Sequence, residues 1–117
     1  MNKRAANKVL ETVLDLANAD NVEVGLIGNT SGFTRLADNV ITQNVASRNV
    51  ELCIHCAFGQ SHGLATTNDL GPVSLKAVVE RAQSIAKISP PDPEYLPPVE
   101  AREAKKYPKV KAYFPAT

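Results

Sequence analysis

The feature that most constrains the fold is a long β-rich stretch, residues 32–69, which only two short turn signals interrupt. The first signal is the pair Asp38-Asn39, residue types that tolerate the positive φ of a two-residue hairpin turn. The second is the segment GQSHG, in which Gly59 and Gly63 are available for left-handed backbone geometry. The stretch therefore predicts two consecutive β-hairpins, and the helices expected on either side of it would pack on the sheet they form.

The first turn also sets the register of its hairpin. With that turn, Leu36 faces Ile41 across the ladder, so that apolar side chains coincide. The strand that follows, residues 40–58, is far longer than the usual ~5–6 residues. We therefore expect a bend or bulge near residues 47–49 (SRN), where three polar residues interrupt the alternation.

Three further segments complete the predicted fold. Residues 3–19 carry apolar side chains at the i, i+3, i+4, i+7 spacing of an amphipathic helix. Residues 22–27 alternate as a half-buried strand, which the turn-forming residues 29–32 (NTSG) would end. Gly71-Pro72 opens a second helix, and Ser89, which precedes two prolines, closes it. The order helix, four strands, helix predicts an α+β fold: a mainly antiparallel sheet of about four strands with two helices packed on one face.

Length and proline content divide the chain into a compact domain and a tail. A chain of 117 residues is expected to form one domain. Seven of the eight prolines lie within residues 90–117, together with four lysines. We therefore expect an α+β domain over residues 1–89 and an extended Pro/Lys-rich connector over residues 90–117.

Charge and hydropathy argue against two classes of partner. A net charge of +1 is not that of an electrostatically driven nucleic-acid binder. The longest apolar run is too short to cross a bilayer, and the first residues lack the apolar core of a signal peptide. The two cysteines, three residues apart, imply no disulfide framework. The default expectation is a cytoplasmic protein that binds neither nucleic acid nor membrane.

Cys53, His55, Cys56 and His62 are the most tempting chemical constellation, because thiolates and imidazoles at short spacing ligate zinc. Side chains of a strand alternate between faces, however, so Cys53 and His55 would share one face while Cys56 points to the other. One ion is not easily shared by both sets, and no second cysteine pair completes a tetrahedron. Neighbouring side chains on one strand are also poorly placed for Cys–His proton transfer. We therefore reject these four as metal ligands and interpret the cysteines as small hydrophobes.

A second polar group surrounds the first hairpin and consists of Arg35, Asn39, Gln43 and Asn44. These residues are candidates for contact with a substrate or partner. The alternative, which we favour, is that they cover the solvated face of a half-buried sheet. Composition, pattern and spacing alone indicate no catalytic residue and no enzyme.

Several segments carry a family resemblance through their order and spacing. They are R-x-A-D-N at residues 35–39, the Gln-Asn pair at 43–44, G-x-A-T-T-N-D at 63–69, and the second helix with its S-P-P-D-P exit at 89–93. Together they resemble the N-terminal domain of the TldD/PmbA family, zinc-dependent peptidases also called modulators of DNA gyrase. The resemblance covers roughly residues 1–98 and extends to residues 113–117.

The resemblance implies that the catalytic residues of the family lie outside this domain. The family's catalytic His-Glu-x-x-x-His helix and its later cysteine ligand belong to the part of the chain beyond this domain. Here His55 and His62 are seven positions apart with no glutamate between them, so no zinc ligand or general base can be carried over. The resemblance thus implies no cofactor in this chain, with zinc in the C-terminal part of full-length relatives. It also implies homo- or heterodimers that enclose a cavity for peptide substrates.

Three hypotheses follow. The preferred one is the non-catalytic N-terminal domain of a TldD/PmbA-like metallopeptidase, inactive alone, which helps to form the subunit assembly and to bound the peptide-access cavity. Relatives are several times longer, so the chain is either a fragment or a naturally detached domain. The alternative is a free-standing interaction module that binds a protein or peptide by strand addition to a sheet edge. The weakest is a small metal-binding protein that uses the Cys/His constellation.

Overall fold

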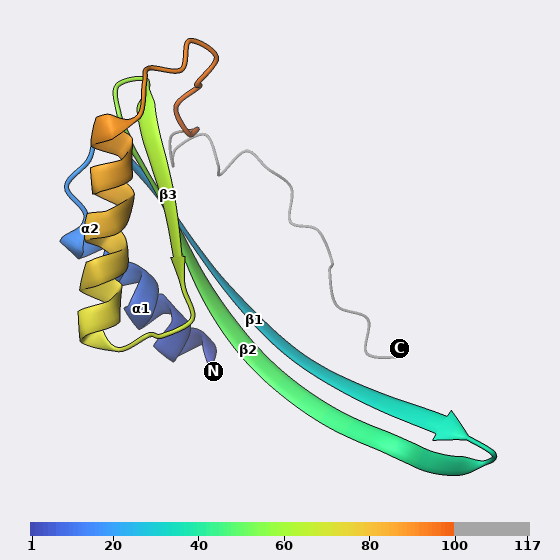
Figure 1. The fold of residues 1–117 in the computed structure, drawn as a ribbon. Coiled ribbons are helices and arrows are strands. Elements are labelled where there is room, and N and C mark those ends of the chain that lie inside the picture. The colour runs from blue at the N-terminus through green and yellow to red at the C-terminus, as the bar shows by residue number, and fades with distance from the viewer. Residues whose placement is uncertain (100–117) are drawn as a thin grey trace.

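The computed structural model describes residues 1–99 and has the α+β architecture expected from the sequence. Three antiparallel strands form one sheet in the order β1-β2-β3, and both helices lie on the same face of it (Figure 1). We call this covered face the inner face and the opposite one the outer face. The elements in chain order are α1 (Lys3–Leu16), β1 (Asn21–Ala37), β2 (Val40–Phe58), β3 (Ser61–Thr67) and α2 (Pro72–Ile88).

The prediction of four strands was wrong, because residues 22–27 and 33–37 belong to one continuous strand. β1 runs through the turn-forming residues 29–32 without a break, and Asn29 pairs with Asn49 while Gly32 pairs with Ala46. The partner strand β2 supplies the ladder hydrogen bonds for these residues, which outweighs their local preference for a turn. The result is one long hairpin followed by a short third strand.

The turn of the long hairpin was predicted correctly. Asp38 and Asn39 both have positive φ, at 52° and 61°, and Leu36 pairs with Ile41. The interruption expected at residues 47–49 was wrong, since these residues pair without a break with residues 29–31. The register shifts nearer the tip instead, where Thr42 is the extra residue between two ladder pairs. Figure 1 shows the ribbon curving gradually along its length.

The hydrophobic core sits at the root of the sheet, where all three strands meet the helices. Leu52, Ile54 and Cys56 project from the inner face of β2 and are fully buried. They pack in one cluster with Val13 of α1, Ala65 of β3 and the buried face of α2. The residues of α2 in this cluster are Leu75, Val78, Val79 and Ala82.

Gly63 sets the distance between α2 and the sheet. It lies on β3 opposite Cys56 and does not use the left-handed geometry that the sequence suggested, which only Gly59 adopts among the described glycines. A Cβ at Gly63 would lie 2.5 Å from the carbonyl oxygen of Ala82 and would also overlap the backbone nitrogen of Ala86. The backbone of α2 therefore rests directly on the backbone of β3 at this point.

The ends of α2 follow the local chemistry that the sequence predicted. Gly71 occupies the N-cap with Pro72 directly after it, and the helix ends at Ile88, with Ser89 as its C-cap before Pro90. The Asp69 carboxylate accepts hydrogen bonds from the Ser74 hydroxyl (2.6 Å) and the Gly71 N–H (2.8 Å). These two hydrogen bonds hold the pKa of Asp69 below its usual value.

α1 is shorter than expected. Its N-cap Asn2 accepts a hydrogen bond from the Ala5 N–H, and the helix ends at Leu16 rather than at residue 19. Neither helix within residues 1–99 is long and apolar enough to span a bilayer. The later part of the predicted connector, with its lysines and residues 113–117, lies outside the described residues.

Candidate functional site

The most prominent feature of the molecule is an arm, which we define as residues 28–37 of β1 and 40–50 of β2 together with their turn. β3 pairs with β2 only from Leu52 to Phe58, so beyond this point the sheet continues as two strands. Figure 1 shows the arm leaving the helices and extending away from the core. At about 3.3 Å per residue, it is on the order of 35 Å long.

The arm carries exposed apolar side chains on both faces. On the outer face Phe33 pairs with Val45, and these side chains are 57% and 43% exposed. On the inner face Leu36 pairs with Ile41, and these are 65% and 60% exposed. A two-stranded ribbon has little stability of its own, and uncovered apolar patches mark interaction surfaces in folded proteins. The arm therefore has the composition of a surface that another polypeptide covers.

The four polar residues predicted around the first hairpin lie on this arm but do not form one cluster. Arg35 and Gln43 are directly opposite each other on the outer face. Asn44 lies on the other face, where its amide oxygen accepts a hydrogen bond from the Thr34 hydroxyl at 3.2 Å. Asn39 is at the tip, in the turn. Only Arg35 and Gln43 could contact the same group of a partner.

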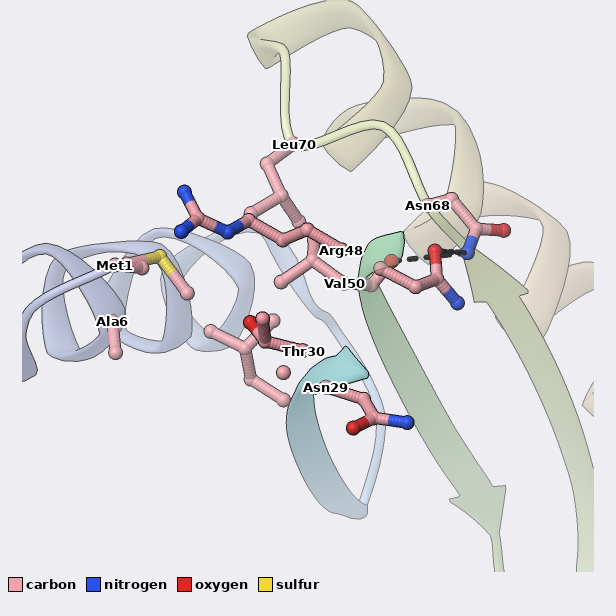
Figure 2. Close-up of a pocket in the computed structure, with 11 residues that line it drawn as sticks. Met1, Ala6, Asn29, Thr30, Arg48, Val50, Asn68 and Leu70 are labelled. Carbon is pink, nitrogen blue, oxygen red and sulfur yellow. Dashed lines mark hydrogen bonds between the residues drawn. The ribbon is translucent and has the colours of Figure 1, made fainter. Parts of the chain in front are cut away.

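A hollow of about 750 Å³ lies at the root of the arm, on the inner side (Figure 2). Arg48 contributes its guanidinium, and Asn68 closes one wall by donating from its side-chain amide to the Val50 carbonyl and to the Asn49 side chain, both at 3.0 Å. The Asn68 bond satisfies the carbonyl of Val50, which lies two residues beyond the end of the β2–β3 ladder at Leu52. The lining residues are Met1, Ala6, Leu26, Gly28, Asn29, Thr30, Arg48, Asn49, Val50, Asn68 and Leu70.

The Cys/His constellation is divided between the two faces of the sheet. Cys56 is buried in the core, and burial raises the pKa of its thiol. Cys53 and His55 lie on the outer face, where His55 meets His62 of β3 with 3.1 Å between Nε2 and Nδ1. In residues 1–99, no group of three or more His, Cys, Asp or Glu side chains is arranged to hold a metal ion.

The pairing of the two histidines was not predicted from the sequence. His62 was expected in the turn, whereas β3 begins at Ser61 after a turn at Gly59 and Gln60. A two-residue turn places His62 opposite Ala57 and thus diagonally next to His55. Pairing the residues on either side of a two-residue turn at Gly59 and Gln60 would have predicted this contact from the sequence.

Residues 92–95, which we call the strap, cover the two histidines on the outer face. The Asp92 N–H donates to the carbonyl of Gln60 at 3.0 Å, and the Asp92 carboxylate lies 3.4 Å from Nε2 of His62. The ring of Tyr95 stacks on His62 with 5.2 Å between centroids. The Tyr95 hydroxyl is buried without a hydrogen-bond partner among the described residues. Desolvation, and to a smaller extent the charge of Glu23, raise the pKa of Tyr95.

Comparison with known proteins establishes the class of fold. No protein-family model matches the chain, and no curated protein matches it in sequence. Among solved structures the fold is that of part of a TldD/PmbA-family protein. One matching structure is the crystal structure of TldE from Thermococcus kodakarensis, with a TM-score of 0.65 and 18% sequence identity over 79% of this chain. The chain corresponds to 20% of the length of that structure. It therefore has a TldD/PmbA-like fold, as the motifs suggested.

Proposed function

We propose that this chain is the non-catalytic N-terminal domain of a TldD/PmbA-like zinc metallopeptidase. In this proposal the domain helps to join subunits and bounds the space through which peptides reach the active site. The fold likeness to part of TldE supports the proposal. So does the sequence, which contains no His-Glu-x-x-x-His motif. Zinc and the proteolytic chemistry belong to the remainder of the longer protein.

The observation that carries the assembly role is the apolar surface of the arm. Full burial of a side chain such as Phe33 or Leu36 contributes about 1.5–3 kcal/mol. Because the apolar pairs project from both faces, contact with a single flat surface would leave one face uncovered. The arm is therefore proposed to insert between two surfaces of a neighbouring subunit or of the rest of the same protein. An arm inserted in this way would help to join two subunits.

Sedimentation velocity on the complete gene product tests the assembly role. The double variant Phe33→Lys/Val45→Lys places charges on the outer face of the arm and is expected to weaken assembly at least tenfold. Val73→Lys is the matched control, because Val73 is 83% exposed but lies on α2, away from the arm. Assembly of the double variant equal to that of the control would refute the assembly role of the arm.

A separate assay tests the non-catalytic assignment. The 117-residue chain is incubated with unfolded peptides with and without Zn²⁺, and no cleavage is expected. Metal-dependent cleavage that a chelator abolishes would overturn the assignment.

Strand addition remains a second candidate, since one observation favours it. Among residues 1–99, nothing pairs with the edge of β2 from Val40 to Glu51 on the side that β3 would occupy, except where Asn68 bonds Val50. A peptide that binds this edge through its backbone would shift the amide resonances of residues 43–49 and would still bind the Phe33→Lys/Val45→Lys variant. Loss of peptide binding in that variant would instead favour side-chain contacts with the faces of the arm.

A further inference from the structure

β1 is an open edge of the sheet along its whole length. Its partner on one side is β2, and no strand among residues 1–99 pairs with its other side (Figure 1). Natural sheets usually protect such an edge with a lysine, a proline or a bulge. β1 contains neither lysine nor proline, and the extra residue near the arm tip, Thr42, belongs to β2. A ladder of 17 residues is therefore available for pairing with another chain.

The sequence of β1 is complementary to itself about its midpoint, Asn29. The only charged residues of the strand are Glu23 and Arg35, which lie equally far from Asn29 on either side and have opposite signs. Both project from the outer face, where their partners on β2 are His55 and Gln43. Two copies of β1 paired antiparallel about Asn29 would therefore place Glu23 of each copy directly opposite Arg35 of the other.

The same register also gives the longest ladder. It pairs Asn21 with Ala37 of the second copy, so that all 17 residues of the strand take part. Residues directly opposite each other must share a face, so the next permitted registers are displaced by two positions. Each of these shortens the ladder and moves the two charges apart. The register that pairs the charges is thus the one that pairs the whole strand.

The sizes of the side chains match in this register as well. Each glycine of β1 faces a larger residue of the second copy: Gly25 faces Phe33, Gly28 faces Thr30, and Gly32 faces Leu26. No heavy atom lies within 4 Å of a Cβ added at Gly25 or Gly32, so there is open space beside these two glycines. The Phe33 side chain is 57% exposed, and an aromatic ring beside a glycine of the neighbouring strand covers the backbone that the glycine leaves bare.

The two charges can meet only between copies. Within residues 1–99, no lysine or arginine pairs with Glu23, whose side chain is 54% exposed, and no carboxylate pairs with Arg35. Along one strand, at about 3.3 Å per residue, Glu23 and Arg35 are on the order of 40 Å apart. Contact between them therefore requires a second chain.

We propose that two copies of this chain join through their β1 strands and combine their sheets into one continuous sheet, with a twofold axis at Asn29. The contact is isologous, because the same strand serves both copies. The arm of each copy then lies beside the root of the other. This inference rests on the proposed assembly role, and it specifies the partner and the register of the contact.

Charge reversal in the 117-residue chain, followed by sedimentation velocity, tests the pairing. The wild type is expected to dimerise. Glu23→Arg or Arg35→Glu alone places like charges opposite each other at two symmetry-related positions and should raise the dimer dissociation constant about tenfold. The double variant Glu23→Arg/Arg35→Glu restores opposite charges and should return the constant close to the wild-type value. Glu51→Arg is the matched control, because it makes the same reversal on the outer face of β2, away from the β1 edge, and should leave the dimer unchanged. A monomeric wild type, or a double variant no tighter than the single variants, would overturn the pairing.

Cysteine cross-linking tests the position of the twofold axis. Asn29→Cys in a Cys53→Ser background places two thiols opposite each other, with about 4.5–5.5 Å between their Cα atoms, and oxidation should give a disulfide-linked dimer. Ser47→Cys in the same background is the control. Residue 47 lies on the outer face of β2 opposite Ser31, so its two copies would be roughly 20 Å apart and should stay unlinked. Absence of the linked Asn29→Cys dimer, or equal linking at both positions, would overturn the register.

The same reversals in the complete gene product separate this inference from the proposed function. They leave the apolar side chains of Phe33 and Val45 unchanged. If assembly tolerates both single reversals but is lost in Phe33→Lys/Val45→Lys, the β1 pairing is wrong and the assembly role of the arm stands. If neither set of variants weakens assembly, both are wrong.

Discussion

Replacement of Gly63 by alanine tests how α2 is held on the sheet. The added Cβ would lie 2.5 Å from the carbonyl oxygen of Ala82 and 2.9 Å from Cβ of Ile85, and it would overlap the backbone nitrogen of Ala86. Two of these three atoms belong to the helix backbone and cannot rotate away. The helix must therefore move outward by roughly 1 Å to restore ordinary contact distances of about 3.5 Å.

The size of the effect follows from what the displacement disturbs. Overpacking a well-packed core typically costs about 1–3 kcal/mol. Here the shift also separates α2 from Leu52, Ile54 and Cys56, which are fully buried. The reduced freedom of the unfolded chain offsets only about 0.4–1 kcal/mol. We expect Gly63→Ala to lower the free energy of unfolding by about 3 kcal/mol, a large share of the ~5–15 kcal/mol of a typical domain.

Urea denaturation followed by circular dichroism measures this change. Gly25→Ala is the matched control, because Gly25 is also a strand glycine but nothing lies within 4 Å of its added Cβ. The control is expected to stay within about 0.5 kcal/mol of the wild type. If Gly63→Ala were as stable as Gly25→Ala with an unchanged m-value, direct seating of the helix backbone on β3 would be wrong.

Three further predictions concern the arm turn, the thiols and the start of α2. Asn39 has a φ of 61°, a left-handed conformation that valine adopts only at a cost, so Asn39→Val should destabilise the turn by about 1–2 kcal/mol. Asn39→Gly should not destabilise it. Loss of cross-strand amide NOEs at the arm tip measures the change. A thiol reagent should modify the partly exposed Cys53 in the folded chain, while Cys56, buried and with its pKa raised, should react only on unfolding; equal rates would contradict the burial of Cys56. The lowered pKa of Asp69 means that its ionised form stabilises the fold above the unfolded-state value of about 3.9 and that this contribution disappears as the pH falls through the lowered pKa. The urea midpoint of the wild type should therefore exceed that of Asp69→Asn at pH 6, and the difference should shrink as the pH falls below the unfolded-state value; a difference that stays constant with pH would contradict the assignment.

Local chemistry decided the parts of the fold that the sequence predicted well. Asp38 and Asn39 tolerate positive φ, and that requirement located the hairpin turn and its register. Pro72 fixed the start of α2, and Ser89 before Pro90 fixed its end, because proline restricts the backbone on both sides of these boundaries. These signals act within a few residues, so they can be interpreted without the rest of the structure.

Pairing with a distant strand decided the parts that were missed. Residues 29–32 have turn-forming side chains, but residues 46–49 of β2 lie opposite and complete their hydrogen bonds, so the strand continues. The contacts of His62 with His55 and with Asp92 were missed for the same reason, because these residues come from β2, β3 and the strap. The sequence places each of these residues on an element but does not show which elements lie side by side. The number of strands and the contact between His55 and His62 therefore both depend on non-local contacts.

The separation of the arm from the core makes the proposed assembly role testable without ambiguity. Leu52, Ile54 and Cys56 of β2 are fully buried at the root, whereas Phe33 and Val45 lie beyond the end of β3 and are 57% and 43% exposed. Lysine at Phe33 and Val45 removes the cross-strand contact of this pair but leaves the buried core untouched, so it should lower the unfolding free energy of the domain by no more than about 1 kcal/mol. A variant that loses assembly while its domain unfolds normally would tie the effect to the arm surface. A long ribbon with apolar side chains on both faces adds little to the stability of this core, which is the physical reason to assign it to contact with another polypeptide.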